Sequence, residues 1–549
     1  MKKTILTVAL TTLLASCGGS NDDDSGAAAP GNATTPASTS TETSPSAATP
    51  ATTSAESAFL AQAFQDGQNE IALSTLALQR TTNPEVSRFA RMMIDEHTRT
   101  NAMITQLAQS RNITLQNLPA AEEATFTTTL SALSGTEFDR AYMEHNVAVH
   151  RTDVTLFQQK VNTGFAAANS SADTQVMDFA AATLPALKLH LAMAKEIGGM
   201  IDPRAFVVNA YQNGLGEIQL SQIALQRASS PEVRQFAQMM IDHHTAMNND
   251  IRQVAQTKGI TLPAELPPEH ALTRDNLMQL AGPDFDKAYM SHNVVVHNGD
   301  VNAARAQSQS GTDTEIRALA ASALPMLTTH LQEAQTIYES IQPSFLFAAL
   351  QSGVAEILLS NLAMQNSTDV EVRTFAQRMI NDHMRANGEV MRLAAREGIP
   401  LPQVLPAEAV LAHQQLRTLT GIEFDRAYMD INVGMHARTV ALFTDRAQNE
   451  TDPELRAFAT TGVAELTAHL EEARRISTRL SSVGTNGAAT TEGAGTGASG
   501  SSTATSDGTV ASGGPPTSGA TGATGGTTST NAGAASGNAS TSGTIVSGS

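Results

Sequence analysis

Hydrophobic and polar residues along the middle of the chain follow the spacing of amphipathic helices. After Phe89, for example, Met93 and Ile94 follow at intervals that place apolar side chains on one helix face. From residue 57 onward this pattern predicts four long helices, over about residues 57–80, 84–111, 136–162 and 172–200. The stretch "TTNPE" before the second of them supplies a polar cap and a proline for the first helical turn.

The connection between the second and third predicted helices is long. It begins with the extended stretch "ITLQNLP" and continues through a short helix. Two helical hairpins joined by one long crossover have the connectivity of a ferritin-like four-helix bundle, whereas an up-and-down bundle would need only a short link there. The pattern therefore favours the ferritin-like arrangement.

This unit occurs three times. The stretch "FLAQAFQDGQNEIALSTLALQR" from Phe59 recurs as "FVVNAYQNGLGEIQLSQIALQR" from Phe206 and "FLFAALQSGVAEILLSNLAMQN" from Phe345. The period is about 140 residues, which is far longer than a solenoid repeat, so each copy is expected to be a domain. We predict an all-α protein of three tandem ferritin-like four-helix bundles, over residues 57–201, 204–341 and 343–482.

The composition changes on both sides of the repeats. Residues 18–55 are mainly Ser, Thr, Ala, Pro and Asp, and residues 483–549 are almost wholly Gly, Ser, Thr and Ala. Such segments cannot bury enough apolar surface to offset their conformational entropy. We therefore predict a disordered N-terminal tether and a disordered C-terminal tail.

Residues 1–17, "MKKTILTVALTTLLASC", have the pattern of a secretory signal: two lysines, an apolar run and small residues. The end of this segment resembles the lipobox of bacterial lipoproteins, in which the cysteine is lipidated and becomes the new N-terminus. The resemblance implies a lipid anchor on Cys17, and Gly18 after it favours the outer membrane, on either its periplasmic or its outer face. An ordinary signal peptide with an incidental cysteine is the alternative.

Composition limits the partners of the protein. No other apolar run approaches the roughly 20 residues that span a bilayer, so we expect a protein anchored to a membrane and not embedded in it. The net charge of −19 argues against nucleic acid, because phosphate binding requires Lys and Arg. Cys17 is the only cysteine, so no disulfide holds the bundles together. Protein partners cannot be named from composition.

Four polar positions recur near the middle of the four helices in every copy. They are one glutamate from the first helix and one histidine from each of the others: Glu70, His97, His150 and His190; Glu217, His244, His297 and His330; Glu356, His383, His436 and His469. These positions use nine of the 14 histidines. At a rise of ~1.5 Å per residue they lie at similar depths. Imidazole and carboxylate together suit Fe, Mn, Zn or Cu, and four such ligands could complete one metal site.

Other recurring polar residues are candidates for hydrogen-bonding partners of these ligands. One set lies three turns before the third-helix histidine, and the other lies one turn after the second-helix histidine: Asp139, Asp286 and Asp425; Asn101, Asn248 and Asn387. The position just before the second-helix histidine holds Glu96, His243 or Asp382, so it accepts any polar group. We interpret it as either a surface position or an auxiliary ligand.

A layer without metal would also explain the recurrence. Duplicated domains share residues through common origin, and a hydrogen-bonded polar layer in a helical bundle can fix the register of the helices. Methionines beside the histidines, such as Met240 and Met290, are usually core filler, although Met and His together also bind copper. No catalytic residues can be assigned, because no Ser-His-acid order stands out and Cys17 is the single thiol.

The repeated segments resemble a bacterial family of unknown function, described as predicted outer-membrane proteins with a ferritin-like fold. The resemblance rests on the mid-helix glutamate, the acid-histidine pair in the second helix, "EFDRAYMEHNVAVH" from Glu137 and "LPALKLHL" from Leu184. It implies the ferritin-like fold in three copies. Di-iron ferritins have Glu-x-x-His pairs, but Ile94, Ile241 and Ile380 stand three residues before the second-helix histidines here. Iron storage is therefore not expected.

The sequence thus predicts an envelope lipoprotein whose bundles bind transition metal, either to buffer the metal or to perform modest redox or peroxide chemistry. Whether the protein is an enzyme is left open. The alternative is a non-enzymatic spacer or interaction module of the envelope, with a polar layer in each bundle and no metal.

Overall fold

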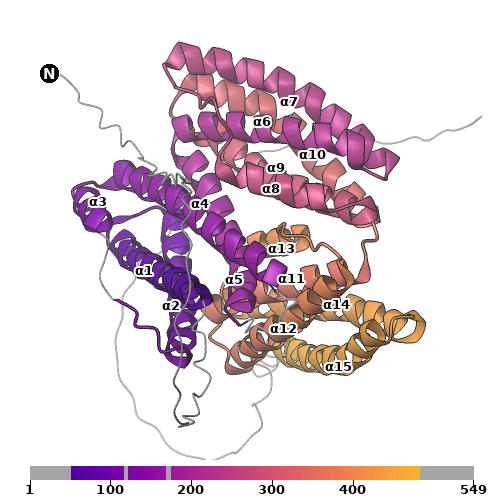
Figure 1. The fold of residues 1–549 in the computed structure, drawn as a ribbon. Coiled ribbons are helices and arrows are strands. Elements are labelled where there is room, and N and C mark those ends of the chain that lie inside the picture. Colours follow the sequence, from indigo (N-terminus) through magenta and orange to yellow (C-terminus); the bar gives the residue numbers. More distant parts are fainter. Residues whose placement is uncertain (1–50, 117–120, 168–174, 483–549) are drawn as a thin grey trace, which may run out of the picture. The chain divides into compact units, whose positions relative to one another are not determined.

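The computed structural model describes residues 51–116, 121–167 and 175–482. These residues form fifteen helices and no strand (Figure 1). The prediction of an all-α chain with three tandem bundles is confirmed. The signal segment with Cys17, the tether before residue 51 and the tail lie outside the described residues, and the first helix already begins at Ala51, inside the segment predicted as tether.

Each copy contains four long helices and one short helix. The first copy has α1 (Ala51–Arg80), α2 (Pro84–Ser110), α3 (Ala121–Ser131), α4 (Gly135–Ala167) and α5 (Gln175–Ile201); the second has α6 (Pro203–Arg227), α7 (Pro231–Lys258), α8 (Pro268–Gln279), α9 (Gly282–Ser310) and α10 (Thr314–Ser340); the third has α11 (Phe345–Asn366), α12 (Val370–Glu397), α13 (Ala407–Leu416), α14 (Gly421–Asn449) and α15 (Pro453–Ser482). The short helices α3, α8 and α13 lie in the crossovers, as the sequence pattern predicts.

Local sequence signals explain where the helices begin and end. Ser230 caps α7, because its Oγ accepts hydrogen bonds from the backbone N–H groups of Glu232 (3.1 Å) and Val233 (3.3 Å). At the other end Gly259 adopts a left-handed conformation with φ of 63°, which a residue without Cβ adopts at little cost. Gly398 ends α12 in the same way. The C-terminal ends of α7 and α12 are therefore set by a glycine in their own sequence.

A buried tyrosine joins the first and third long helices of every bundle. The hydroxyl of Tyr142 lies 2.7 Å from Ser74 Oγ. The same hydrogen bond recurs between Tyr289 and Ser221 (2.7 Å) and between Tyr428 and Ser360 (2.8 Å). These serines come one helical turn after the recurring glutamates. The tyrosines therefore fix the axial position of the glutamate-bearing helix relative to the third long helix.

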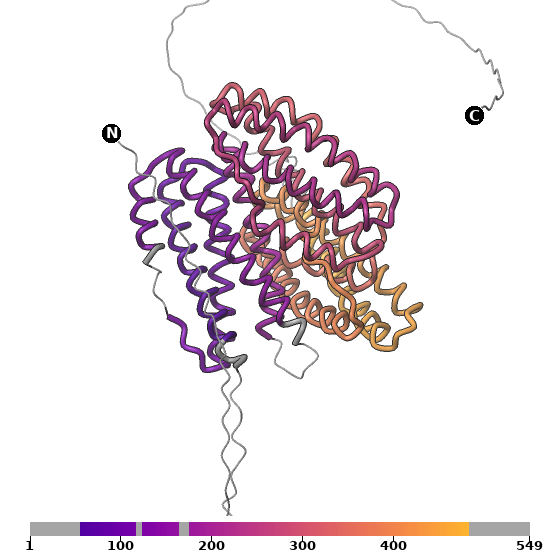
Figure 2. Tube along the Cα trace, turned by 45° about the horizontal axis from the view of Figure 1, so that its top comes forward, coloured from indigo at the N-terminus to yellow at the C-terminus, as the bar shows by residue number. Residues whose placement is uncertain are grey.

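The three bundles contact one another, although the sequence pattern treats them as separate units. Figure 2 traces them in chain order, and only Asp202 separates α5 from α6. Gln307 Nε2 donates to the carbonyl of Gly199 (2.8 Å), and Ser291 Oγ donates to that of Leu405 (2.7 Å). The bundles therefore share packing surfaces within the described part of the chain.

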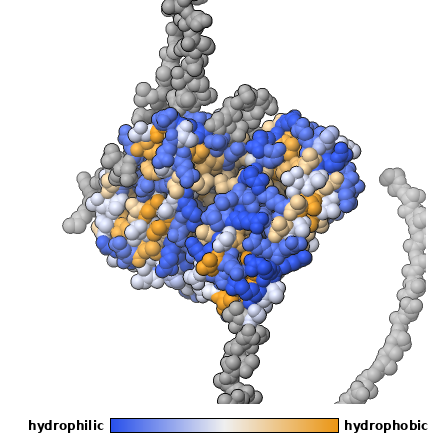
Figure 3. All heavy atoms as spheres, turned by 90° about the horizontal axis from the view of Figure 1, so that it is seen from below, coloured by the Kyte–Doolittle hydropathy of each residue, from blue (hydrophilic) through white to orange (hydrophobic). Residues whose placement is uncertain are grey.

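Two of the described helices, α5 and α11, are long and apolar enough to cross a membrane by length and composition. In the most apolar 18-residue stretch of each helix, most residues are buried in the bundles: 61% in α5 and 83% in α11. Such burial is typical of core helices. The face of the molecule in Figure 3 is mainly hydrophilic, with its hydrophobic residues in separate small groups.

Candidate metal centre

The four long helices of each bundle bring the predicted glutamate and histidines together in the core. All twelve side chains are buried; the least buried are His97 and His383, each with 6% exposure. In each bundle, one ring nitrogen from each of the three histidines lies within 4.8 Å of the other two. Each bundle therefore contains a histidine triad beside a buried carboxylate.

The first bundle shows the arrangement in detail. His97 Nε2 lies 2.6 Å from Glu70 Oε2 without hydrogen-bond geometry, and His150 Nδ1 lies 3.3 Å from Glu70 Oε1. His150 Nε2 in turn lies 3.3 Å from His190 Nδ1. The glutamate thus lies between the second and third helices of the bundle, and the three rings face one another.

The middle bundle repeats this geometry closely. Glu217 lies 3.1 Å from His244 Nε2 and 3.3 Å from His297 Nδ1, and His297 Nε2 lies 3.3 Å from His330 Nδ1. In the third bundle the distance between Glu356 Oε1 and His436 Nδ1 is again 3.3 Å. The histidine triad and the contact between the glutamate and the third-helix histidine therefore recur in all three bundles.

Backbone carbonyls orient the histidine of the third long helix. His150 Nδ1 lies 2.9 Å from the carbonyl oxygen of Asn146, one turn earlier on the same helix. His297 and His436 make the same contact at 2.9 and 3.0 Å. A carbonyl can only accept, so Nδ1 carries the proton and Nε2 presents a lone pair to the centre of the triad.

The variable polar position before the second-helix histidine orients the histidine of the fourth long helix. His190 Nε2 donates to Glu96 (2.9 Å), and His469 Nε2 donates to Asp382 (3.0 Å). In the middle bundle His243 Nδ1 and His330 Nε2 share a hydrogen bond of 2.8 Å. This position is exposed at His243 and partly buried at Glu96 and Asp382. It is a hydrogen-bonding partner outside the triad, and its one signal in the sequence is a polar residue at this place in all three copies.

Each triad leaves buried ring nitrogens that the protein does not satisfy. In the third bundle His383 Nε2, His436 Nε2 and His469 Nδ1 have no hydrogen-bond partner within the described residues, and neither does Glu356 Oε2. The other nitrogens of His436 and His469 are already held by Asn432 and Asp382. The free donor atoms therefore point inward, where a cation would lie.

Burial also keeps most of these imidazoles neutral. It lowers the pKa of His150, His297 and His436 to about 4, and it lowers the pKa values of His244 and His383 well below the ordinary value. Neutral imidazole is the form that binds metal. These five rings are thus in the protonation state that a metal site requires at neutral pH.

The aspartates proposed as partners of the ligands lie elsewhere. Asp286 accepts hydrogen bonds from the backbone N–H groups of Ser229 (3.0 Å) and Ser230 (2.8 Å), in the turn between α6 and α7. Asp139 and Asp425 form side-chain hydrogen bonds with Thr81 and Ser367 in the corresponding turns. Eleven residues of helix span ~16 Å, so a shared helix face does not bring these carboxylates to the histidines.

The proposed asparagines lie in the core but pack against a glycine. The Cβ that an alanine would carry at Gly67 would lie 2.6 Å from Asn101 Oδ1, and Gly214 stands in the same relation to Asn248. At Gly353 the corresponding distance to Asn387 Oδ1 is 2.1 Å. A glycine stands three residues before the glutamate in every copy, and this recurrence is the sequence signal for the close approach of the first two helices.

A fourth group of potential ligands overlaps the third site. Asp382, Glu465 and His469 lie close enough to hold an ion. However, Asp382 pairs with Arg378 and Arg385, both at 3.3 Å, and Glu465 also pairs with Arg385. These carboxylates are neutralised by arginine, so the triad is the better cation site.

Comparison with known proteins gives a family but no activity. No curated protein and no solved structure matches the chain. The model of a family described as a domain of unknown function, DUF4142, matches residues 41–197, 200–337 and 339–476. These three matches coincide with the three repeats and cover most of the chain, which therefore belongs to the DUF4142 family and carries three tandem copies of its domain.

Proposed function

We propose that each bundle binds one divalent transition metal ion through its glutamate and three histidines, so that the protein holds three ions at the bacterial envelope. The observation that carries this proposal is the set of inward-facing ring nitrogens in each triad. The outer nitrogens of the third- and fourth-helix histidines are engaged by Asn carbonyls or by Glu96, His243 and Asp382. Fixed outer partners of this kind are typical of metal-binding histidines.

Electrostatics favours a cation between the rings. With Nδ1 of His150 and Nε2 of His190 protonated, the facing nitrogens at 3.3 Å both present lone pairs. Each buried polar atom left without a partner costs about 1–3 kcal/mol. A tetrahedral ion with bonds of ~2.1 Å has ligand atoms ~3.4 Å apart, which is close to the 3.3 Å between His150 Nε2 and His190 Nδ1. A metal ion would therefore satisfy all of these atoms at once.

The donor set narrows the chemistry. Three neutral imidazoles and one carboxylate suit Zn²⁺, Cu²⁺, Fe²⁺ or Mn²⁺ better than Ca²⁺ or Mg²⁺, which prefer oxygen ligands. A site with all four protein ligands bound would buffer or store metal. Redox chemistry would require an open coordination position on the ion, where an outside molecule could bind.

The test is the metal content of the full chain carrying Cys17→Ser, measured by mass spectrometry after reconstitution with each of these metals. We expect three equivalents of one metal. The pair Glu217→Gln and His244→Gln should lower this to two equivalents and leave the helix content unchanged. His145→Gln is the control, because His145 stacks on Phe126 (3.9 Å between ring centroids) outside the triad.

A chain that binds no metal under any of these conditions would refute the proposal. It would leave the polar layer as a device that fixes helix register in an envelope spacer. Unchanged metal content in the Glu217 and His244 variant would refute the ligand set alone.

We further propose that Cys17 anchors the protein to the outer membrane. The support is the sequence pattern of residues 1–17 and the polar segment that follows it. Cys17→Ser should move the protein from the membrane fraction to the soluble fraction of the cells, and a variant that stays in the membrane fraction would contradict lipid anchoring.

A further inference from the structure

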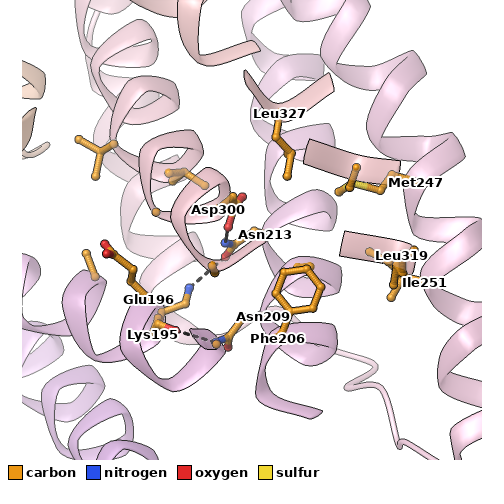
Figure 4. Close-up of a pocket in the computed structure, with 18 residues that line it drawn as sticks. Lys195, Glu196, Phe206, Asn209, Asn213, Met247, Ile251, Asp300, Leu319 and Leu327 are labelled. Carbon is orange, nitrogen blue, oxygen red and sulfur yellow. Dashed lines mark hydrogen bonds between the residues drawn. The ribbon is translucent and has the colours of Figure 1, made fainter. Parts of the chain in front are cut away.

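The layer of side chains one helical turn from the metal ligands differs among the bundles. The first bundle places the carboxyl groups of Asp66 and Asp153 there, hydrogen-bonded to each other. In the middle bundle Asn213 Nδ2 donates to Asp300 (2.8 Å), and Lys195 donates to Asn213 Oδ1 (3.0 Å), as Figure 4 shows. The same positions in the third bundle hold Ser352 and Thr439, whose hydroxyls lie 2.9 Å apart. The ligands are thus constant while their surroundings are not.

The third bundle has a cavity beside its metal site. The cavity has a volume of about 570 Å³ and is lined by residues of all four long helices, with His383 and His469 in its wall. The pocket beside His97 and His190 in the first bundle has only about 20 Å³. A molecule from outside could therefore reach the third histidine triad far more easily than the first.

The corresponding pocket of the middle bundle is also small and does not include the triad. Its volume is about 100 Å³, and Met247 lies in its wall. Figure 4 shows Met247 with Leu319 and Leu327 on the apolar side of this pocket, across from Lys195, Asn213 and Asp300. A methionine thus occupies space one turn from His244.

Small side chains account for the cavity in the third bundle. Ala386 stands where the middle bundle has Met247 and the first has Thr100. Gly462 stands where the other copies have Thr183 and Ala323, and it lets the ring of Phe443 lie against α15, because a Cβ at Gly462 would lie 2.4 Å from that ring. The neighbouring ring of Phe458, 5.5 Å from that of Phe443, also lines the cavity.

The lining indicates an uncharged aromatic occupant. Each charged side chain around the cavity has an oppositely charged partner: Arg392 pairs with Glu389 (2.6 Å), Asp382 and Glu465 pair with Arg385, and Glu454 pairs with Arg396. An ionic ligand would have to break one of these ion pairs. Aromatic rings favour stacked or edge-on contact with Phe443 and Phe458, and the hydroxyls of Ser352 and Thr439 offer hydrogen bonds.

We propose that the third bundle binds an uncharged aromatic alcohol, such as a phenol, in this cavity with its hydroxyl toward the His383, His436 and His469 triad. This inference rests on the proposed function, because the hydroxyl would approach the metal ion that the triad is proposed to bind. It assigns different roles to the three bundles: the third site is open to an outside molecule, and the first two are enclosed.

The test uses the full chain carrying Cys17→Ser, loaded with metal, and 4-fluorophenol as the probe, observed by ¹⁹F NMR. We expect saturable binding at one site per chain. Ala386→Met, which copies Met247, should weaken binding at least tenfold with the metal content unchanged. Thr100→Met, the same change in the first bundle, is the matched control and should leave binding unchanged.

A second variant guards against misfolding of the first. Ala457 is exposed and lines the cavity, so Ala457→Phe can narrow it without repacking the core, and it should also weaken binding at least tenfold. Absence of saturable binding in a chain with three metal equivalents would overturn this inference and leave the metal proposal intact. Wild-type affinity for 4-fluorophenol in both Ala386→Met and Ala457→Phe would also overturn this inference. Failure of the chain without these substitutions to bind metal would instead refute the metal proposal.

Discussion

At the scale of single residues, the atoms outside the triad determine which nitrogen each histidine presents. Glu96 holds His190 at 2.9 Å; burial tends to raise the pKa of Glu96, but His190 outweighs this effect and lowers it to about 2. An ionised Glu96 accepts a hydrogen bond from the Nε2–H group of His190, so that Nδ1 of His190 presents its lone pair to the triad. The recurring acid or imidazole before each second-helix histidine therefore has a defined structural role.

Glu96→Gln tests this role. An amide in place of the carboxylate weakens the hydrogen bond to His190, and loss of such an outer partner typically lowers metal affinity 10–100-fold. We expect this loss at one of three sites, measured by competition with a chromophoric chelator. Asp95→Asn, next to it on α2, is the control. Equal metal affinity in the two variants would contradict the assignment.

At the scale of helices, a glycine sets the distance between the first two helices of each bundle. A Cβ at Gly214 would meet Asn248 Oδ1 at 2.6 Å, a separation that real Cβ atoms do not tolerate. The glycine lies three residues before Glu217, so the contact that brings α6 close to α7 also brings the glutamate close to His244.

Gly214→Ala should therefore destabilise the middle bundle. Overpacking of this kind costs about 1–3 kcal/mol, which outweighs the gain in helix propensity. Gly299→Ala in α9 is the matched control, because a Cβ there meets no atom within 4 Å, and it should be neutral or stabilising. Urea denaturation of both variants measures the difference, and equal stability would show that α6 can move away from α7 at no cost.

At the scale of the whole molecule, the buried histidines couple stability to pH in the absence of metal. The pKa values of His297 and His436 are about 4 in the folded protein, against an ordinary value of 6.5, because burial disfavours the charged ring. The unfolded chain therefore binds more protons below pH 6.5, and its stability relative to the folded state rises. His97 acts in the opposite direction, since Glu70 outweighs the effect of burial and raises its pKa. Glu217 and Glu356 also act in the opposite direction, because burial raises the pKa of both carboxyl groups.

The metal-free protein should thus be less stable at pH 5 than at pH 7. The loss begins near pH 6.5 and continues toward pH 4, where these rings become protonated in the folded state as well. Urea denaturation in the presence of a chelator measures it. His297→Gln should reduce the dependence on pH, and a stability that does not change between pH 7 and pH 5 would contradict the protonation states assigned to the triads.

The sequence by itself determined the number of bundles, the order of their helices and the set of one glutamate and three histidines in each. Helical periodicity and recurrence are properties of the chain read along its length, so no coordinates were needed. The prediction that Asp139, Asp286 and Asp425 are hydrogen-bonding partners of the ligands is wrong. A shared helix face does not specify the position along the helix axis, and these aspartates contact the turn between the first two helices of each bundle.

Only the tertiary structure decided which partner holds each histidine and which site has space beside it. Glu96 contacts His190 from another helix, and the cavity beside His383 depends on Ala386, Gly462 and Ser352, which come from three helices. Each of these residues is unremarkable in its own segment. Hydrogen bonds and free volume arise where side chains from distant segments meet, and they follow from the packing of all four helices together.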